Sequence, residues 1–206
     1  FMSMIIIIAS YLSTYSGSYS MDNYYCQYEE PWSSFPYGEE TIKTSGCGPT
    51  TFAMVVSTIT DTQMNPAEAA VYFEESGYCL VSEDGNTATT WSAFERGITP
   101  YGLSSSGCGT NLKKGLEIIA NGGMVVCSVG NSANGGEGNA LFNGDGHFIA
   151  IRGISESGNL LILDPASRKN TEQEWDAETV QEILKQCWQI YPNSESENVH
   201  REHFFG

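Results

Sequence analysis

Basic residues are scarce in this chain of 206 residues. Nine lysines and arginines stand against 25 aspartates and glutamates, which gives a formal net charge of −16. A nucleic-acid-binding surface needs a basic patch, and anionic membrane surfaces attract basic segments. The composition therefore argues against nucleic acid and membrane surfaces as partners. The acidic surface either keeps the protein soluble or attracts basic peptides.

Long apolar runs and C-x-x-C pairs are also absent. The apolar stretch at residues 4–9 is too short to span a bilayer and follows no basic residue, so neither membrane insertion nor an intact signal peptide is expected. The stretch is instead the remnant of a signal peptide or a strand of an arm. Six cysteines are too few for a disulfide scaffold, and a thiolate zinc site is not expected without C-x-x-C.

The length allows one domain with a sizeable core, preceded by an arm. Residues 1–20 end in a stretch rich in Ser and Tyr, which is typical of a linker. We therefore expect an N-terminal arm or linker over residues 1–20 and a single domain over residues 21–206.

A cysteine between two glycines is the clearest candidate for a reactive group. Cys47 lies in the sequence SGCGPT at residues 45–50, and an apolar run follows it. Proline suits the first turn of a helix, and a helix without a polar face has to be central. A helix N-terminus favours the thiolate form of a cysteine. We therefore predict that Cys47 is a nucleophile at the start of a buried helix over residues 48–60.

A nucleophilic cysteine needs a base, and only His147 among three histidines has a suitable setting. It opens a strand-like run, a turn follows at residues 155–158, and a second strand-like run ends at Asp164. Antiparallel pairing about this turn brings Asp164 to the strand end that carries His147, where a carboxylate can orient the ring. Asp145, in a glycine loop, is an alternative partner. A histidine in this position can also be an ordinary core residue.

Gln27, twenty residues before Cys47, is a candidate for a fourth part of the site. A side-chain amide can donate a hydrogen bond to the oxyanion of acyl transfer, as can the backbone N–H of the nucleophile. Alternatively, Gln27 is only a loop residue. The aromatic residues Trp32, Phe35 and Tyr37 follow it, and they either wall a narrow cleft or pack into the core.

The order Gln27, Cys47, His147 and Asp164 resembles that of the papain-like cysteine peptidases. The chain is most similar to the bacteriocin-processing peptidases that cleave double-glycine leaders, and there to the stand-alone C-39-like domains without a transporter. The matching stretches lie between residues 24 and 167: they are CQY at 26–28, PW at 31–32, and residues 45–54, 146–153 and 163–165. The interval between Gln27 and Cys47 is longer here than in papain and in the transporter-linked members.

This resemblance implies an α+β, papain-like fold in which a central buried helix packs on an antiparallel β-sheet. The residue patterns agree, because helices are expected over residues 48–60, 65–73, 90–96 and 111–120, and strands follow over 124–129, 147–154, 159–164 and 187–191. The glycine- and asparagine-rich residues 130–146 are either a long connection or a lid beside the site.

Two other cysteines are weaker candidates for the nucleophile. Cys108 also lies between glycines and precedes an expected helix, but that helix is amphipathic and half exposed, so Cys47 is preferred. Cys127 lies in a buried strand pattern and is expected to be an inert core residue.

The residues and the resemblance together predict a cysteine peptidase that acts on a peptide or protein substrate. Cys47, His147 and Asp164 form its triad, Gln27 assists as an oxyanion donor, and neither metal nor cofactor is needed. The resemblance implies a preference for small residues such as Gly before the cut. The alternatives are a thiol amidase or acyltransferase on the same fold, and a non-catalytic peptide-binding module.

The polar N-terminal stretch favours export from a bacterium, which predicts an extracellular or cell-surface location. In that case a disulfide could form within the group Cys26, Cys79, Cys108 and Cys187, and the sequence does not choose a pairing. The oligomeric state is likewise open.

Overall fold

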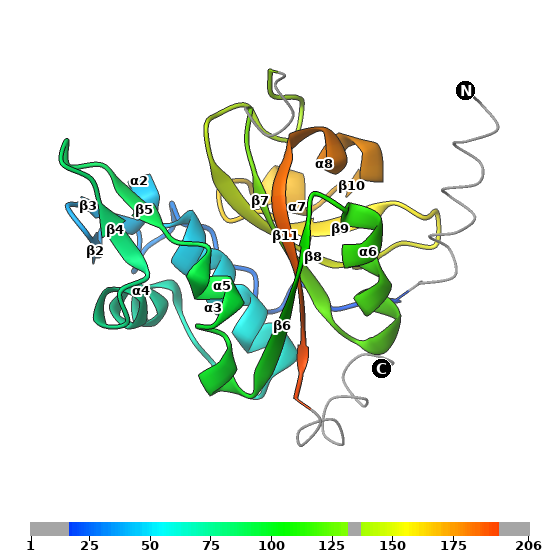
Figure 1. Cartoon of the computed structure of the whole chain (residues 1–206), viewed down its shortest axis with the longest axis horizontal. Helices are drawn as coiled ribbons and strands as arrows, with labels where there is room; N and C mark the ends of the chain where they lie inside the picture. Colours follow the sequence, from blue (N-terminus) through cyan, green and yellow to red (C-terminus); the bar gives the residue numbers. More distant parts are fainter. Residues whose placement is uncertain (1–16, 132–136, 194–206) are drawn as a thin grey trace.

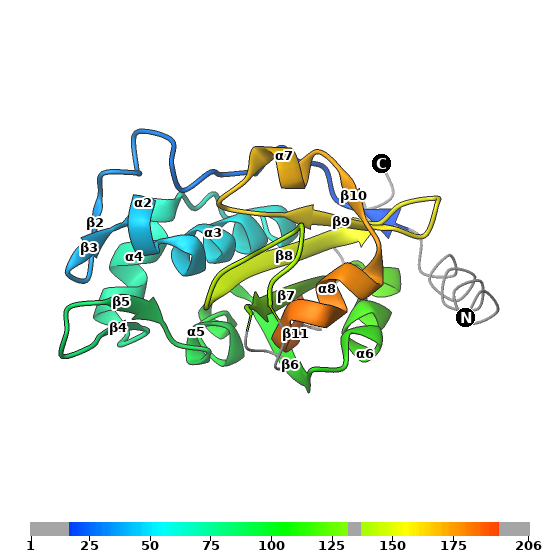
Figure 2. The same cartoon turned by 90° about the horizontal axis from the view of Figure 1, so that it is seen from above.

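Two strands with apolar residues at nearly every position form the centre of the sheet. In this computed structural model, which describes residues 17–131 and 137–193, these strands are β7 (Met124–Val129) and β8 (His147–Ile154), and almost all their side chains are buried. Consecutive strand residues are buried only when both faces of the sheet are covered. Helices accordingly pack on both faces of the sheet (Figures 1 and 2).

The other elements are mostly short. The helices are α2 (Ile42–Ser45), α3 (Cys47–Ile59), α4 (Pro66–Glu75), α5 (Ser92–Glu95), α6 (Leu112–Leu116), α7 (Arg168–Thr171) and α8 (Ala177–Ile183), with 3-10 turns η2 (Thr99–Tyr101) and η3 (Glu117–Asn121). The strands are β1 (Gly17–Ser18), β2 (Pro36–Tyr37), β3 (Glu40–Thr41), β4 (Cys79–Val81), β5 (Thr87–Thr89), β6 (Leu103–Gly109), β9 (Leu160–Leu163), β10 (Glu174–Trp175) and β11 (Leu184–Pro192).

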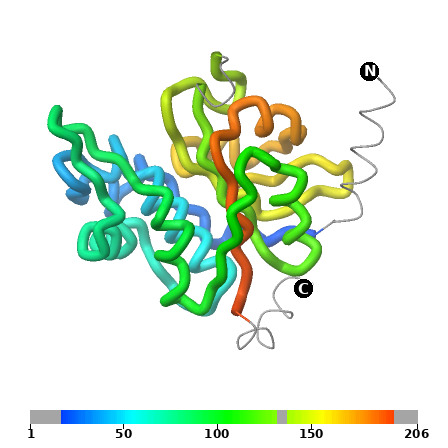
Figure 3. Tube along the Cα trace, viewed as in Figure 1, coloured from blue at the N-terminus to red at the C-terminus, as the bar shows by residue number. Residues whose placement is uncertain are grey.

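The main sheet is antiparallel, with strand order β10-β9-β8-β7-β11-β6, and β1 pairs with the end of β8. The hairpins β2–β3 and β4–β5 lie apart from it, beside α2 and α4 (Figure 1). Mixed helices and an antiparallel sheet make this an α+β structure. Figure 3 shows how the N-terminal segment runs from the sheet toward these hairpins and so links the two sides of the molecule.

Helix α3 has no solvent-exposed face, as its sequence predicts. Its residues from Gly48 to Ser57 are all buried, because α4 packs on one side and strands β7 and β8 on the other. Phe52 lies at the centre of an aromatic group, with ring centroids 5.0–6.0 Å from those of Tyr72, Phe73, Phe94 and Tyr101. This packing fixes the helix that carries Cys47 against the strand that carries His147.

A second apolar cluster covers the opposite face of the sheet. Alternate residues of β7 and β8 point to opposite faces, so Val126 and Phe148 join the cluster around α3, while Cys127 and Ile149 join the other. The second cluster also contains the buried side chains of α6 and α8, among them Leu112, Leu116, Val180 and Ile183. Strand β8 therefore contributes to both cores.

Capping signals place two of the helices correctly. Asn65 accepts hydrogen bonds from the backbone N–H groups of Ala67 and Glu68, and the Glu68 carboxylate accepts from the N–H of Asn65, so α4 begins where the sequence predicts. Asn111 caps α6 with a single bond, which its side chain accepts from the N–H of Lys114. The helix expected over residues 111–120 is instead a short α-helix continued by the 3-10 turn η3.

Strand β6 is absent from the sequence prediction, in which Cys108 only precedes the helix expected over residues 111–120. Residues 103–109 read LSSSGCG and lack the apolar alternation of a strand. They become a strand because they pair with the apolar strand β11 at the edge of the sheet. Cys108 therefore lies within a strand, and α6 begins only at Leu112.

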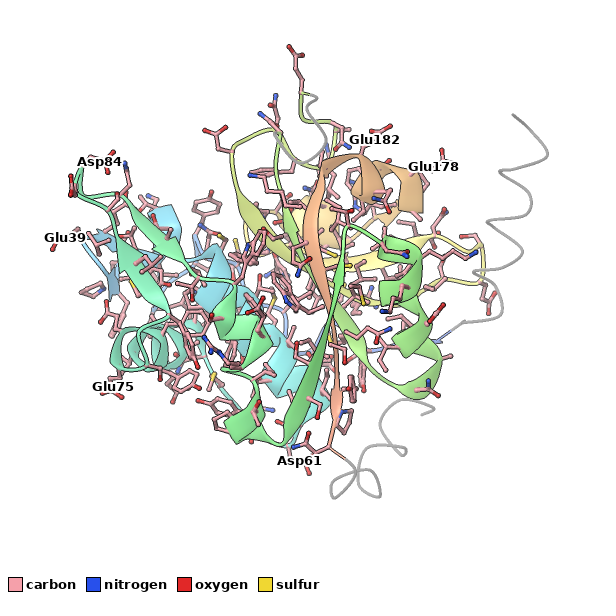
Figure 4. All side chains as sticks on the ribbon, in the orientation of Figure 1. Glu39, Asp61, Glu75, Asp84, Glu178 and Glu182 are labelled. Atoms are coloured by element: carbon pink, nitrogen blue, oxygen red, sulfur yellow. The ribbon has the colours of Figure 1, made fainter. Side chains whose placement is uncertain are left out.

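Acidic side chains lie on the surface at both sides of the molecule. Figure 4 shows Glu39, Glu75 and Asp84 on the side of the two hairpins and Glu178 and Glu182 on α8, and all five are exposed. In the described ranges, no helix has both the length and the apolar character needed to cross a bilayer.

Candidate active site

Cys47 is the first residue of α3, and two glycines set its position. A side chain at Gly46 would clash with the backbone and side chain of Ile42, and one at Gly48 would clash with the side chain of Thr89. Both neighbours must therefore be glycine for α2, α3 and β5 to meet closely around the cysteine. Cys47 as a whole residue is partly exposed.

The surroundings of Cys47 stabilise its thiolate. Burial alone would raise the pKa of the thiol, but a hydrogen bond from His147, the charge of that ring, and the backbone N–H groups of Phe148 and Gly48 lower it further than burial raises it. The net effect is a pKa below the ordinary value, as the position at a helix N-terminus predicts.

His147 is the first residue of β8, and it pairs with Val129, the last residue of β7. The register of β8 and β9 pairs Ala150 with Leu163, so the next residue, Asp164, faces Ile149. Side chains two residues apart on a strand share a face, so Asp164 and His147 are diagonal neighbours. Nε2 of His147 and Oδ1 of Asp164 are 2.8 Å apart, and both side chains are almost fully buried, with 6% and 2% exposure.

The imidazole is held in its charged form. Burial lowers the pKa of His147, but hydrogen bonds with Asp164 and Cys47 and the charges of both partners raise it to about 9. Because Nε2 donates to the carboxylate, Nδ1 is the nitrogen left to face the thiol. The group is therefore arranged as a thiolate–imidazolium pair backed by a carboxylate.

Two residues beside His147 were not predicted from the sequence. The ring of Phe142 stacks on the imidazole, with centroids 4.8 Å apart and planes at 14°. Asn170 donates from Nδ2 to Oδ2 of Asp164 over 2.8 Å. Phe142 lies in the glycine-rich stretch before His147. It is the single aromatic residue of that stretch, and this was the only feature of the sequence that could have indicated a role at the site.

Gln27 lies close to the site, but its amide is engaged elsewhere. Its backbone N–H donates to the carbonyl of Pro165, directly after Asp164. Its Nε2 donates to the carbonyls of Lys43 at 3.0 Å and Ile42 at 3.4 Å, in the short helix before Cys47. Within the described residues, Oε1 has no hydrogen-bond partner. The assignment of Gln27 as an oxyanion donor therefore stays a prediction.

The alternative site residues lie elsewhere. Asp145 is exposed, and its carbonyl accepts from Lys185, so the carboxylate beside His147 is Asp164. Burial raises the pKa of Cys108, Cys127 and Cys187, which lie on adjacent strands under α6 and α8. All six cysteines are free thiols.

The three aromatic residues after Gln27 all contact the core, but to different extents. Tyr37 is fully buried, and Trp32 and Phe35 pack against the cluster around α3. The more exposed aromatic residue here is Tyr28, with 51% exposure. Burial raises its pKa, and the charges of Cys26, Asp164 and Cys47 raise it further.

The stretch 130–146 is only partly described, since residues 132–136 lie outside the described ranges. The remainder is fastened at Asn139, whose Nδ2 donates to the carbonyl of Thr179 over 2.7 Å and whose Oδ1 accepts from the N–H of Leu141 over 3.0 Å. In the part of the chain that the structure describes, no three His, Cys, Asp or Glu side chains gather as a metal site would require.

A thiol, an imidazole and a carboxylate thus interact in sequence, which is an arrangement that can support attack on an acyl carbon. A comparison with protein-family models matches residues 21–196 to the peptidase C39-like family, and this range contains Cys47, His147 and Asp164. A search of curated proteins found no match. On the extent of the family match, the chain belongs to the peptidase C39-like family.

Proposed function

We propose that this protein is a cysteine peptidase with a papain-like fold, which hydrolyses peptide bonds through Cys47, His147 and Asp164. The observation that carries the proposal is the continuous contact from the thiol at a helix N-terminus, through the imidazole, to a buried carboxylate. The complete set of groups argues against a non-catalytic binding module. The family match supports the same class of chemistry.

In this mechanism the thiolate of Cys47 attacks the carbonyl carbon of the scissile peptide bond. The backbone N–H of Cys47 stabilises the oxyanion, and Gln27 adds a second donor if its amide turns away from the carbonyls of Ile42 and Lys43. The imidazolium of His147 protonates the leaving amine, and the C–N bond breaks to leave a thioester on Cys47. His147 then takes a proton from water, which hydrolyses the thioester.

The proposed substrate is a peptide or protein with a small residue, such as Gly, before the cut. Matched peptides that carry Gly-Gly, Ala-Gly, Leu-Leu or Phe-Arg before the scissile bond test both the activity and this preference. We expect faster cleavage after Gly-Gly and Ala-Gly. A clear preference for Phe-Arg would contradict the proposed specificity and indicate a general protease.

The assignment of the nucleophile has a matched control in the same chain. Cys47→Ala should abolish cleavage, whereas Cys108→Ala should leave it unchanged, because Cys108 is held in strand β6 under α6. An irreversible thiol inhibitor should stop the unsubstituted enzyme in proportion to modification of Cys47. Cleavage that survives Cys47→Ala would refute the proposed mechanism.

A further inference from the structure

The side chain of Asn170 holds the oxygen of Asp164 that His147 leaves free. Its Nδ2 donates one hydrogen bond to Oδ2 of Asp164 over 2.8 Å and another to the carbonyl of Leu141 over 3.1 Å. A carboxamide nitrogen has two hydrogens, so both are used. Asn170 therefore joins the carboxylate of the site to the loop that precedes His147.

The bond to Asp164 determines how the carboxylate is turned. Oδ1 accepts from Nε2 of His147 at 2.8 Å and from the N–H of Ala166 at 2.9 Å, whereas Asn170 is the donor to Oδ2 among the described residues. The carboxylate torsion is broad, and a buried carboxylate oxygen without a donor is costly. A donor on each oxygen fixes the plane of the group and keeps Oδ1 directed at the imidazole.

The hydrogen bond from Asn170 to the carbonyl of Leu141 holds the loop that covers the face of the imidazole. Leu141 precedes Phe142, whose ring stacks on His147. Leu141 is itself buried, and its N–H is held by Asn139. The one carboxamide of Asn170 is therefore connected both to the edge of the imidazole, through Asp164, and to its face, through Phe142.

We propose that Asn170 is a positioning residue, which sets the orientation of Asp164 and of the loop carrying Phe142 and so maintains the thiolate–imidazolium pair of Cys47 and His147. The inference rests on the proposed role of Cys47 as the reactive thiol, but not on the identity of the substrate. The backbone of Asn170 has its own partners, Ser167 Oγ for its N–H and Trp175 Nε1 for its carbonyl, so substitution of the side chain leaves these bonds in place.

The test is the rate at which iodoacetamide alkylates Cys47, measured from about pH 5 to about pH 10, because this rate follows the thiolate. Asn170→Ala should lower the rate about tenfold at neutral pH and move the acid limb of the profile to higher pH, since a less well-oriented imidazolium stabilises the thiolate less.

Asn170→Asp keeps the shape of the side chain but donates to Asp164 only while its own carboxyl is protonated. The ratio of its alkylation rate to that of the unsubstituted protein should therefore be close to one in acid. The ratio should fall as the pH rises through the pKa of the pair formed by the new carboxyl group and Asp164. A purely structural role for Asn170 would not produce this pH-dependent recovery.

Asn159→Ala is the matched control. Asn159 also donates from Nδ2 to a carboxylate, Glu174 at 3.0 Å, but at the turn end of the β8–β9 hairpin. The Asn159→Ala substitution should leave the pH profile of Cys47 alkylation unchanged. An unchanged profile in both Asn170 variants, or an equal shift in Asn159→Ala, would overturn the proposal. A shifted profile in a protein that cleaves no peptide would refute the proposed function alone, and normal cleavage with an unchanged profile would refute this inference alone.

Discussion

Thr51 donates a hydrogen bond from Oγ1 to the carbonyl of Phe148 over 3.2 Å and so joins the helix of Cys47 to the strand of His147. The donor lies one helical turn after the cysteine, and the acceptor lies one residue after the histidine. The bond is buried and therefore ties the start of the helix that carries Cys47 to the start of the strand that carries His147.

Thr51→Val should lower the free energy of unfolding by about 1 kcal/mol and slow the alkylation of Cys47, because the substitution leaves the Phe148 carbonyl without this donor. Urea unfolding measures the first effect. Thr50→Val is the neighbouring control: among the described residues the Thr50 hydroxyl is buried without a partner, so its removal should be neutral or stabilising. Equal destabilisation by both variants would contradict this role of Thr51.

Cys47 should be the first of the six cysteines to react with substoichiometric iodoacetamide. Its pKa is lowered by His147 and by backbone N–H groups, whereas burial raises the pKa of Cys79, Cys108 and Cys187. Peptide mapping of the native protein identifies the adduct. Earlier labelling of Cys108 or Cys26 would show that the reactive thiol has been misassigned.

The pH dependence of kcat/KM should be bell-shaped. The pKa of His147 is raised to about 9, so the imidazolium persists up to that pH, while the lowered pKa of Cys47 keeps the thiolate present well below the ordinary thiol range. The ion pair exists between these two limits. Activity should therefore rise as Cys47 loses its proton and fall near pH 9 as His147 loses its own. His147→Ala should move the acid limb of Cys47 alkylation to higher pH, because it removes the hydrogen bond and the charge that lower the pKa of the thiol.

Asp164→Ala should reduce kcat by about 10²- to 10⁴-fold without removing the nucleophile. It should also move the alkaline limb of the pH profile below about 9, because the hydrogen bond and charge of Asp164 contribute to the raised pKa of His147. Steady-state kinetics on the best peptide, at several pH values, separates the two effects. An alkaline limb that does not move would mean that another group sets the His147 pKa.

Tyr28→Ala should raise KM about fivefold while the alkylation rate of Cys47 stays unchanged, because Tyr28 presents an exposed ring beside the site and is not part of the triad. Tyr28→Phe should behave like the unsubstituted protein. Leu80→Ala, which truncates a similarly exposed side chain on β4, is the control. If KM rises equally in Leu80→Ala, Tyr28 has no specific contact with the peptide.

The central helix and the His147–Asp164 contact could be predicted because both follow from local patterns. The helix is apolar on all sides and therefore has to be buried, and the hairpin turn brings the outer ends of β8 and β9 together. The register shift between Ile151 and Gly153 could not be predicted from the turn. The residues that complete the site could not be predicted in this way. Phe142 reaches His147 from an irregular segment, and Asn170 reaches Asp164 from the short helix α7, so neither contact follows from the strand and helix patterns that predict the rest of the site.

Strand β6 and the three aromatic residues after Gln27 illustrate the same limit. LSSSGCG has little intrinsic preference for a strand, and its conformation comes from pairing with β11. The burial of Tyr37 depends in part on Thr89 of β5, whose hydroxyl meets the Tyr37 hydroxyl at 2.6 Å. Such contacts between distant segments leave no trace in the local sequence.

Cys47 and His147 belong to different layers of the molecule, since Cys47 begins a helix of one core and His147 begins a strand that serves both cores. The reactivity of the thiol is therefore a property of the docked layers and of neither alone. During refolding, brief pulses of iodoacetamide at successive times would record when the helix and the hairpin come together. The extent to which each pulse alkylates Cys47 therefore measures the time course of tertiary assembly.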